Sequence, residues 1–144
     1  MQPPRLYYRM KHFLRDAYYD LKYALQRFYR GYGDDEIINL DVALARWILP
    51  RLRAFRAAQP GIPSDVVRHA YGLLGIPSDK MYEANDRDAE AFALARDVWN
   101  EKLDHMIEGF EEVLIDIEAD REGDERKIQT ALTLLAEHYR GMWL

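Results

Sequence analysis

The stretch GYGDDEIINLDVALARWILPRLRAFR, residues 31–56, decides the predicted fold. Two glycines predict a tight turn, and the acidic residues 34–36 favour a helix start, because free backbone N–H groups attract negative charge there. Apolar residues then recur every three or four positions and predict a buried helical stripe: Leu40, Leu44, Trp47, Ile48, Leu52 and Phe55. We therefore expect a central helix over residues 34–58, kinked at Pro50 because proline lacks an N–H.

A second apolar stripe precedes the turn and predicts a helix over residues 5–30. Its members also recur every three or four positions: Leu6, Met10, Phe13, Ala17, Leu21, Ala24 and Phe28. We expect this stripe to pack against the central helix. Asn39 is a second possible helix cap, so an alternative interpretation makes residues 34–38 a separate short turn.

A short repeat follows the central helix. The segment GIPSD occurs at residues 61–65 and again at 75–79, and in each copy the serine is a natural N-cap. Two copies are too few for a solenoid. We therefore expect one or two short helices in a connecting segment over residues 64–87.

Two further apolar stripes predict a long helix over residues 88–120 and a terminal helix over 124–142. Gly109 lies inside the long helix, where a close helix crossing would explain a residue of low helix propensity. No stretch alternates apolar and polar residues, so no strand is expected. The predicted fold class is all-α, a bundle of about four principal helices in a single domain over residues 1–144.

Composition excludes several classes of function. Zero cysteines exclude a disulfide framework, a thiolate zinc site and cysteine catalysis. No apolar run has the length of a signal peptide or of the ~18 residues that span a bilayer, so we expect no membrane partner. Charge is uneven: residues 1–72 carry 12 Lys/Arg and 7 Asp/Glu, and residues 73–144 carry 8 and 18. Either a basic binding surface or complementary packing of the two halves explains this split.

Several blocks of sequence occur in a recognisable order. The first joins the turn to the spaced apolar residues: Gly31, Tyr32, Gly33, Asp34, Asp35, Glu36, Leu40, Asp41, Leu44, Ala45, Ile48, Leu52, Arg53 and Phe55. Gly61-Ile62-Pro63 follows, then Trp99 to Glu111, and finally Ala131 to Trp143. The order resembles a family of small hypothetical proteins encoded by tailed bacteriophages, although the segment 64–90 is longer than the family's link.

This resemblance implies an all-helical fold, a viral origin and a location in the host cytoplasm. It implies no assigned activity, so no catalytic residues are carried over from the family.

The long helix carries the weak candidates for a metal site. Glu101, His105 and Glu108 share one helix face at spacings of four and three, which brings possible ligands together. This face lies opposite the apolar stripe, so a solvated acidic face is the favoured interpretation. Because the chain has no Glu-x-x-His or His-Glu-x-x-His motif, we expect no cofactor.

Glu108-x-x-Glu111 matches half of a motif in all-α magnesium-dependent nucleotide pyrophosphohydrolases, which hold magnesium around a triphosphate with E-x-x-E and a later E-x-x-D. No E-x-x-D follows it, because Glu101-x-x-Asp104 precedes it on the same helix. There is also no nucleophile elbow and no glycine-rich phosphate loop. Enzymatic activity is therefore kept as an alternative, and no catalytic residue is predicted.

The outer face of the first helix is the predicted interaction face. Basic and aromatic residues follow helical spacing on the side away from the apolar stripe: Arg5, Tyr8, His12, Arg15, Tyr19, Lys22, Tyr23 and Arg30. Tyrosine and arginine are favoured anchors in protein interfaces. The same residue types bind single-stranded nucleic acid, with cations on phosphates and rings under bases.

An overall pI near 5.4 counts against a dedicated nucleic-acid binder. The favoured hypothesis is a phage-type accessory protein that acts by protein–protein binding and self-associates through the first helix or the long helix, with another protein as the alternative partner. Single-stranded nucleic-acid binding through the interaction face is the alternative.

Overall fold

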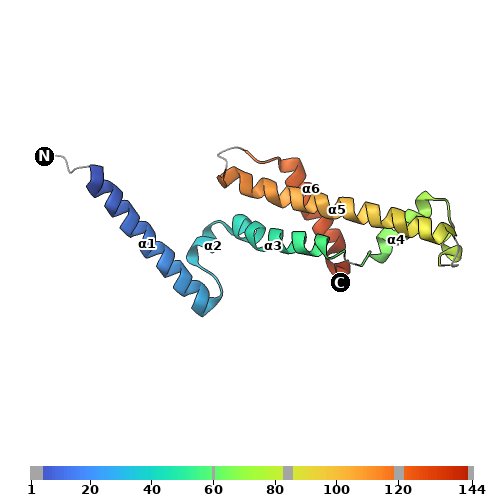
Figure 1. The fold of residues 1–144 in the computed structure, drawn as a ribbon, viewed down its shortest axis with the longest axis horizontal. Helices are drawn as coiled ribbons and strands as arrows, with labels where there is room; N and C mark the ends of the chain where they lie inside the picture. The colour runs from blue at the N-terminus through green and yellow to red at the C-terminus, as the bar shows by residue number, and fades with distance from the viewer. Residues whose placement is uncertain (1–4, 60, 83–85, 119–121, 143–144) are drawn as a thin grey trace. The chain divides into compact units, whose positions relative to one another are not determined.

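The computed structural model describes residues 5–59, 61–82, 86–118 and 122–142, and every regular element in these ranges is a helix (Figure 1). No strand occurs in them, so the prediction of an all-α fold is confirmed. Packing divides the chain into two compact units, Met1–Ala43 and Leu44–Leu144, which we call unit 1 and unit 2. A single domain over the whole chain stays a prediction.

Unit 1 contains α1 (Arg5–Arg30) and α2 (Asp34–Ile38). The helix α1 has the predicted bounds, and Gly31 follows it with φ of +82°, a left-handed conformation that favours glycine. The prediction of one helix over 34–58 is wrong. Asn39 has φ of −124° and ψ of 65°, which is not helical, and it separates α2 from α3 (Leu40–Ala57). The alternative interpretation, with a separate short element before Asn39, is therefore correct.

Unit 2 is built around α5 (Asp86–Glu118), which packs against α4 (Ser64–Leu73) and α6 (Glu125–His138), as Figure 1 shows. The expectation that the helix bearing Pro50 is central is wrong. The longest continuous row of buried side chains lies on α5: Ala91, Ala95, Trp99, Leu103, Met106 and Phe110. Small alanines at its start and large residues after them let α4 and α6 approach different parts of one helix.

The predicted stripe of α3 is only partly buried. Leu52 is in the core of unit 2 and Ile48 and Phe55 pack against it, as predicted, whereas Leu40, Leu44 and Trp47 are exposed. Ala45 and Leu49, which the prediction omitted, are also in this core. Two arginines link α3 to α5, since Arg53 donates to Glu111 at 2.6 Å and Arg56 to Asp104 at 3.0 Å. The helix runs unbroken through Pro50, and the predicted kink stays a prediction.

The connecting segment folds as predicted, with α4 followed by the short 3-10 helix η1 (Ser78–Lys80). Gly75 lies between these two helices and has φ of +67°. The predicted long helix over 88–120 is α5, and the terminal helix over 124–142 is α6 followed by η2 (Tyr139–Gly141). Gly109 lies where α5 meets α6, because a Cβ built there would be 2.3 Å from the Ala131 Cβ. The predicted close crossing is confirmed.

Candidate interaction surfaces

The polar face of the last turns of α1 is occupied by α2. Asp34 accepts hydrogen bonds from Gln26 at 2.7 Å and from Arg30 at 2.6 Å, and it lies 3.4 Å from the Lys22 Nζ. Arg27 binds the next two carboxylates, with Asp35 at 2.5 Å and Glu36 also paired. The three acidic residues that predicted a helix start therefore hold α2 against the last turns of α1.

These contacts shift the pKa values of side chains on both helices. The hydrogen bonds from Arg30 and Gln26 lower the pKa of Asp34 to about 2. The hydrogen bond to Glu36 raises the pKa of Arg27, and the hydrogen bond to Asp34 raises that of Arg30. All of these groups remain substantially exposed to water. The pairs therefore fix the position of α2 more than they stabilise the fold.

The predicted interaction face is divided by α2. Lys22 and Arg30 carry the ion pairs with Asp34, and Tyr23 lies half-buried with its ring stacked on Tyr19 at 5.9 Å between centroids. His12 and Arg15 stay exposed, with Arg15 beside Asp16 at 3.3 Å. Arg5 and Tyr8 lie within α1, but their side chains are outside the described residues. An interaction through this face stays a prediction.

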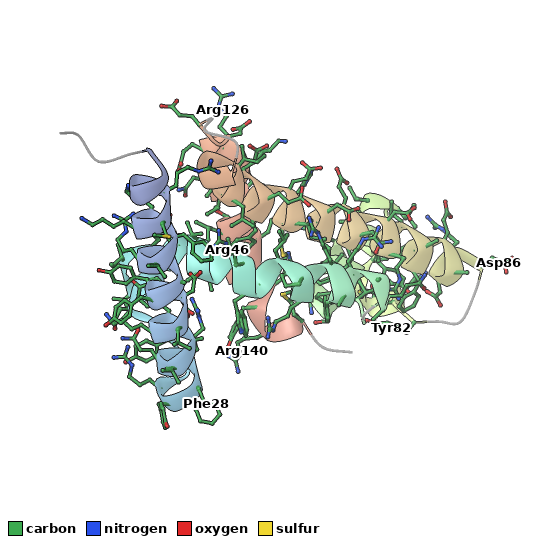
Figure 2. All side chains as sticks on the ribbon, turned by 60° about the vertical axis from the view of Figure 1, so that its left-hand side comes forward. Phe28, Arg46, Tyr82, Asp86, Arg126 and Arg140 are labelled. Atoms are coloured by element: carbon green, nitrogen blue, oxygen red, sulfur yellow. The ribbon has the colours of Figure 1, made fainter. Side chains whose placement is uncertain are left out.

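The apolar face of α1 is open within unit 1, and its packing on the central helix stays a prediction. We call it the α1 stripe, and it comprises Met10, Phe13, Leu14, Ala17, Tyr18, Leu21, Ala24, Leu25 and Phe28. All of its members are exposed, Phe13 to 70% and Phe28 to 81%. Figure 2 shows the side chains along α1, with Phe28 labelled near the end of the helix. Because α2 binds the opposite face, the described residues of unit 1 leave the α1 stripe uncovered.

Unit 2 has an apolar groove between α3 and the C-terminal elements. We call it the α3/α6 groove, and it is lined by Leu44, Trp47, Ile48, Arg51, Leu52, Phe55, Leu135, Tyr139 and Met142. Trp47 is 56% exposed and Tyr139 72% exposed at its margins. Arg51 lies over the Trp47 ring at 4.2 Å and donates to the Trp47 carbonyl at 2.5 Å, so this part of the wall is held by α3 itself.

A third feature of unit 2 is a polar hollow above a buried histidine. His138 is only 5% exposed and packs edge-on against Trp99 at 5.2 Å between ring centroids. Asp65 lies 3.3 Å from its Nδ1, and His69, Lys102 and Glu137 line the same hollow. Burial lowers the pKa of His138, and Lys102 lowers it further, while Asp65 and Glu137 oppose the shift. Both ring nitrogens are enclosed, so they are not presented to the hollow.

The weak metal candidates do not converge. Glu101, His105 and Glu108 lie on the exposed side of α5, and the described residues contain no group of three or more His, Asp or Glu that could hold a metal ion. Their acidic neighbours serve as ion pairs, since Asp104 binds Arg56 and Glu111 binds Arg53. The half-motif of the pyrophosphohydrolase hypothesis therefore lies in a helix-packing contact.

Comparisons with protein-family models, with curated proteins and with solved structures each find no match to this chain. Within the described ranges, none of the helices combines the length and the apolar character that crossing a bilayer requires.

Proposed function

We propose that this protein acts by binding protein, and that it self-associates through the α1 stripe. The observation that carries the proposal is the division of α1, whose last turns bind α2 on their polar face while the described residues of unit 1 leave the apolar face open. A solvated surface helix normally turns its apolar side inward. Because α1 instead turns its apolar side outward, we infer that an apolar partner outside unit 1 covers it.

The exposed area is large enough for a stable interface. Seven large side chains of the stripe are at least half exposed: Met10, Phe13, Leu14, Tyr18, Leu21, Leu25 and Phe28. At roughly 100 Å² for each, since a whole aromatic side chain buries about 150–250 Å², they offer about 700 Å². A standard interface buries about 800 Å² per partner, so covering the stripe accounts for nearly all of one.

The spacing of the stripe also supports a helical partner. Met10, Leu14, Ala17, Leu21, Ala24 and Phe28 alternate steps of four and three residues, which is the repeat that seats side chains between those of a facing helix. The alanines permit close approach of that helix. The partner on which the stripe can be tested without further components is a second copy of the chain.

The nucleic-acid alternative has less support from the contacts. Unit 1 carries 7 Lys/Arg and 6 Asp/Glu, so its net charge is only +1. Three of the cations near the end of α1, Lys22, Arg27 and Arg30, are already paired with carboxylates of α2. Phosphate binding would have to displace these carboxylates. The resemblance to phage proteins adds the proposal that the protein is a phage accessory protein in the host cytoplasm.

The test is sedimentation of the full chain over a range of concentrations. The expected result is a species of twice 17.0 kDa that dissociates on dilution. Leu21→Asp should weaken self-association at least ~100-fold, because it removes a buried leucine of about 1.5–3 kcal/mol and buries a carboxylate in its place. A parent chain that stays monomeric at every concentration removes the proposal.

A matched control lies on the opposite face of the same helix. Tyr19→Asp introduces the same carboxylate two residues away, on the predicted interaction face. Self-association should survive this change. If Tyr19→Asp dissociates the protein and Leu21→Asp does not, the partner binds the Tyr/Arg face and the assignment to the stripe is wrong.

A further inference from the structure

The α3/α6 groove is a second large apolar surface, and the described residues of unit 2 leave it open. Leu44, Trp47 and Tyr139 are exposed along its margins, and Ile48, Phe55, Leu135 and Met142 are half-buried within it. We propose that the groove receives the α1 stripe of a second copy, and that the two copies exchange stripes reciprocally. This inference rests on the proposed self-association and names the surface that accepts the stripe.

The dimensions of the two surfaces agree. The groove follows α3 from Leu44 to Phe55, about 16 Å at 1.5 Å per residue. Leu14 and Leu25 of the stripe are the same eleven residues apart, so three helical turns of α1 match the length of the groove. An amphipathic helix that lays its apolar face into an apolar groove is a common mode of recognition.

The groove also has the residue types that bind helices tightly. Trp47 from α3 and Tyr139 from η2 contribute aromatic rings to its lining. Because Arg51 lies on the Trp47 ring and is hydrogen-bonded to the backbone of α3, the ring is held in place before binding. Tryptophan, tyrosine and arginine are the residues that carry most binding energy in interfaces.

Reciprocal exchange accounts for both open surfaces at once. Each copy has one stripe and one groove, so two copies supply two matched pairs and the assembly closes at a dimer. Pairing of stripe with stripe covers about 700 Å² on each copy, from the side-chain areas given above, but leaves the groove in water. Soluble proteins rarely expose contiguous apolar patches of more than about 300–600 Å², which favours the arrangement that covers both.

A complementation experiment tests the exchange. Leu21→Asp disables the stripe and leaves the groove intact, whereas Trp47→Asp disables the groove and leaves the stripe intact. Each variant alone should self-associate at least ~100-fold more weakly than the parent. When the two variants are mixed, one labelled with a fluorophore, sedimentation should show a mixed dimer, because one intact stripe then meets one intact groove.

Two further variants keep the test decisive. Leu44→Asp alters the groove at a second position and replaces Trp47→Asp if that chain fails to give the helical circular dichroism of the parent. Leu73→Asp is the control, because Leu73 is an exposed leucine of α4 that lies outside the groove. It should leave self-association unchanged.

The contrary outcomes separate this inference from the proposed function. If the groove variants dimerise like the parent while Leu21→Asp does not, stripes pair with stripes, so the exchange is wrong and self-association stands. If both single variants are monomeric and their mixture is also monomeric, the exchange is overturned. If the parent chain itself is monomeric, both proposals fail.

Discussion

Gly109 lies at a close contact between α5 and α6, and Gly109→Ala tests this contact. A Cβ at this position would lie 2.3 Å from the Ala131 Cβ and 2.4 Å from the Lys127 carbonyl oxygen. The carbonyl belongs to the backbone of α6, so it cannot rotate away and the two helices have to separate. Overpacking of this kind costs about 1–3 kcal/mol, and occasionally more, while alanine regains about 1 kcal/mol of helix propensity.

Because the obstructing atoms belong to the backbone and to a Cβ, we expect a cost near or above the upper end of that range. The net loss should be about 2 kcal/mol, or about 6 °C in Tm at roughly 3 °C per kcal/mol. Thermal and urea unfolding followed by circular dichroism measure it. Gly72→Ala is the matched control, because a Cβ at Gly72 of α4 meets no atom within 4 Å. A Gly109→Ala protein as stable as the parent refutes the close crossing.

Three further predictions concern single contacts. The free energy of unfolding should fall as the pH drops below about 6.5, because the folded state lowers the pKa of His138 and so binds fewer protons than the unfolded state. His138→Phe should reduce this dependence of stability on pH. Carbon-13 NMR of Asp34 should give a pKa of about 2, which rises when Arg30→Ala removes the first hydrogen bond. Tyr71→Phe should cost about 1–3 kcal/mol, because the buried hydroxyl donates to Asp88 at 2.7 Å.

The Tyr71 prediction has a control on an exposed residue. Tyr139→Phe should cost nothing measurable, since Tyr139 is exposed. A pH slope that survives His138→Phe, an Asp34 pKa near 4 or a neutral Tyr71→Phe would each contradict the corresponding contact.

Most of the helices could be predicted, because neighbouring residues determine where they begin and end. α1 ends at Arg30, where predicted, because Gly31 adopts the left-handed conformation that terminates a helix. The close crossing at Gly109 followed from the cost of glycine inside a helix. Periodicity and special backbone positions are properties of a few neighbouring residues, and they need no knowledge of the tertiary fold.

The covering of each helix could not be predicted in the same way. Spacing identified the apolar side of α1 but not whether this chain supplies the residues that cover it. Asp34 was interpreted as part of a helix start, and α2 does begin there, but its side chain bonds Gln26 and Arg30 of α1. A carboxylate that serves a helix start and one that binds a distant cation have the same sequence signature.

α3 also shows that spacing alone does not predict which apolar side of a helix is buried. It carries two apolar stripes, one with Ala45 and Leu49 that is buried in unit 2, and one with Leu44 and Trp47 that lines the groove. Only the second was singled out in the sequence, because its members are larger. A helix that is apolar around more than half of its circumference has a second surface to cover, and this was the available signal for the groove.

The most direct test of self-association is hydrogen exchange of the α1 amides as a function of protein concentration. If the stripe is an interface between copies, protection of residues 10–28 should rise with concentration in step with the dimer fraction, while protection of α5 stays constant. Protection of α1 that does not change with concentration would contradict the account.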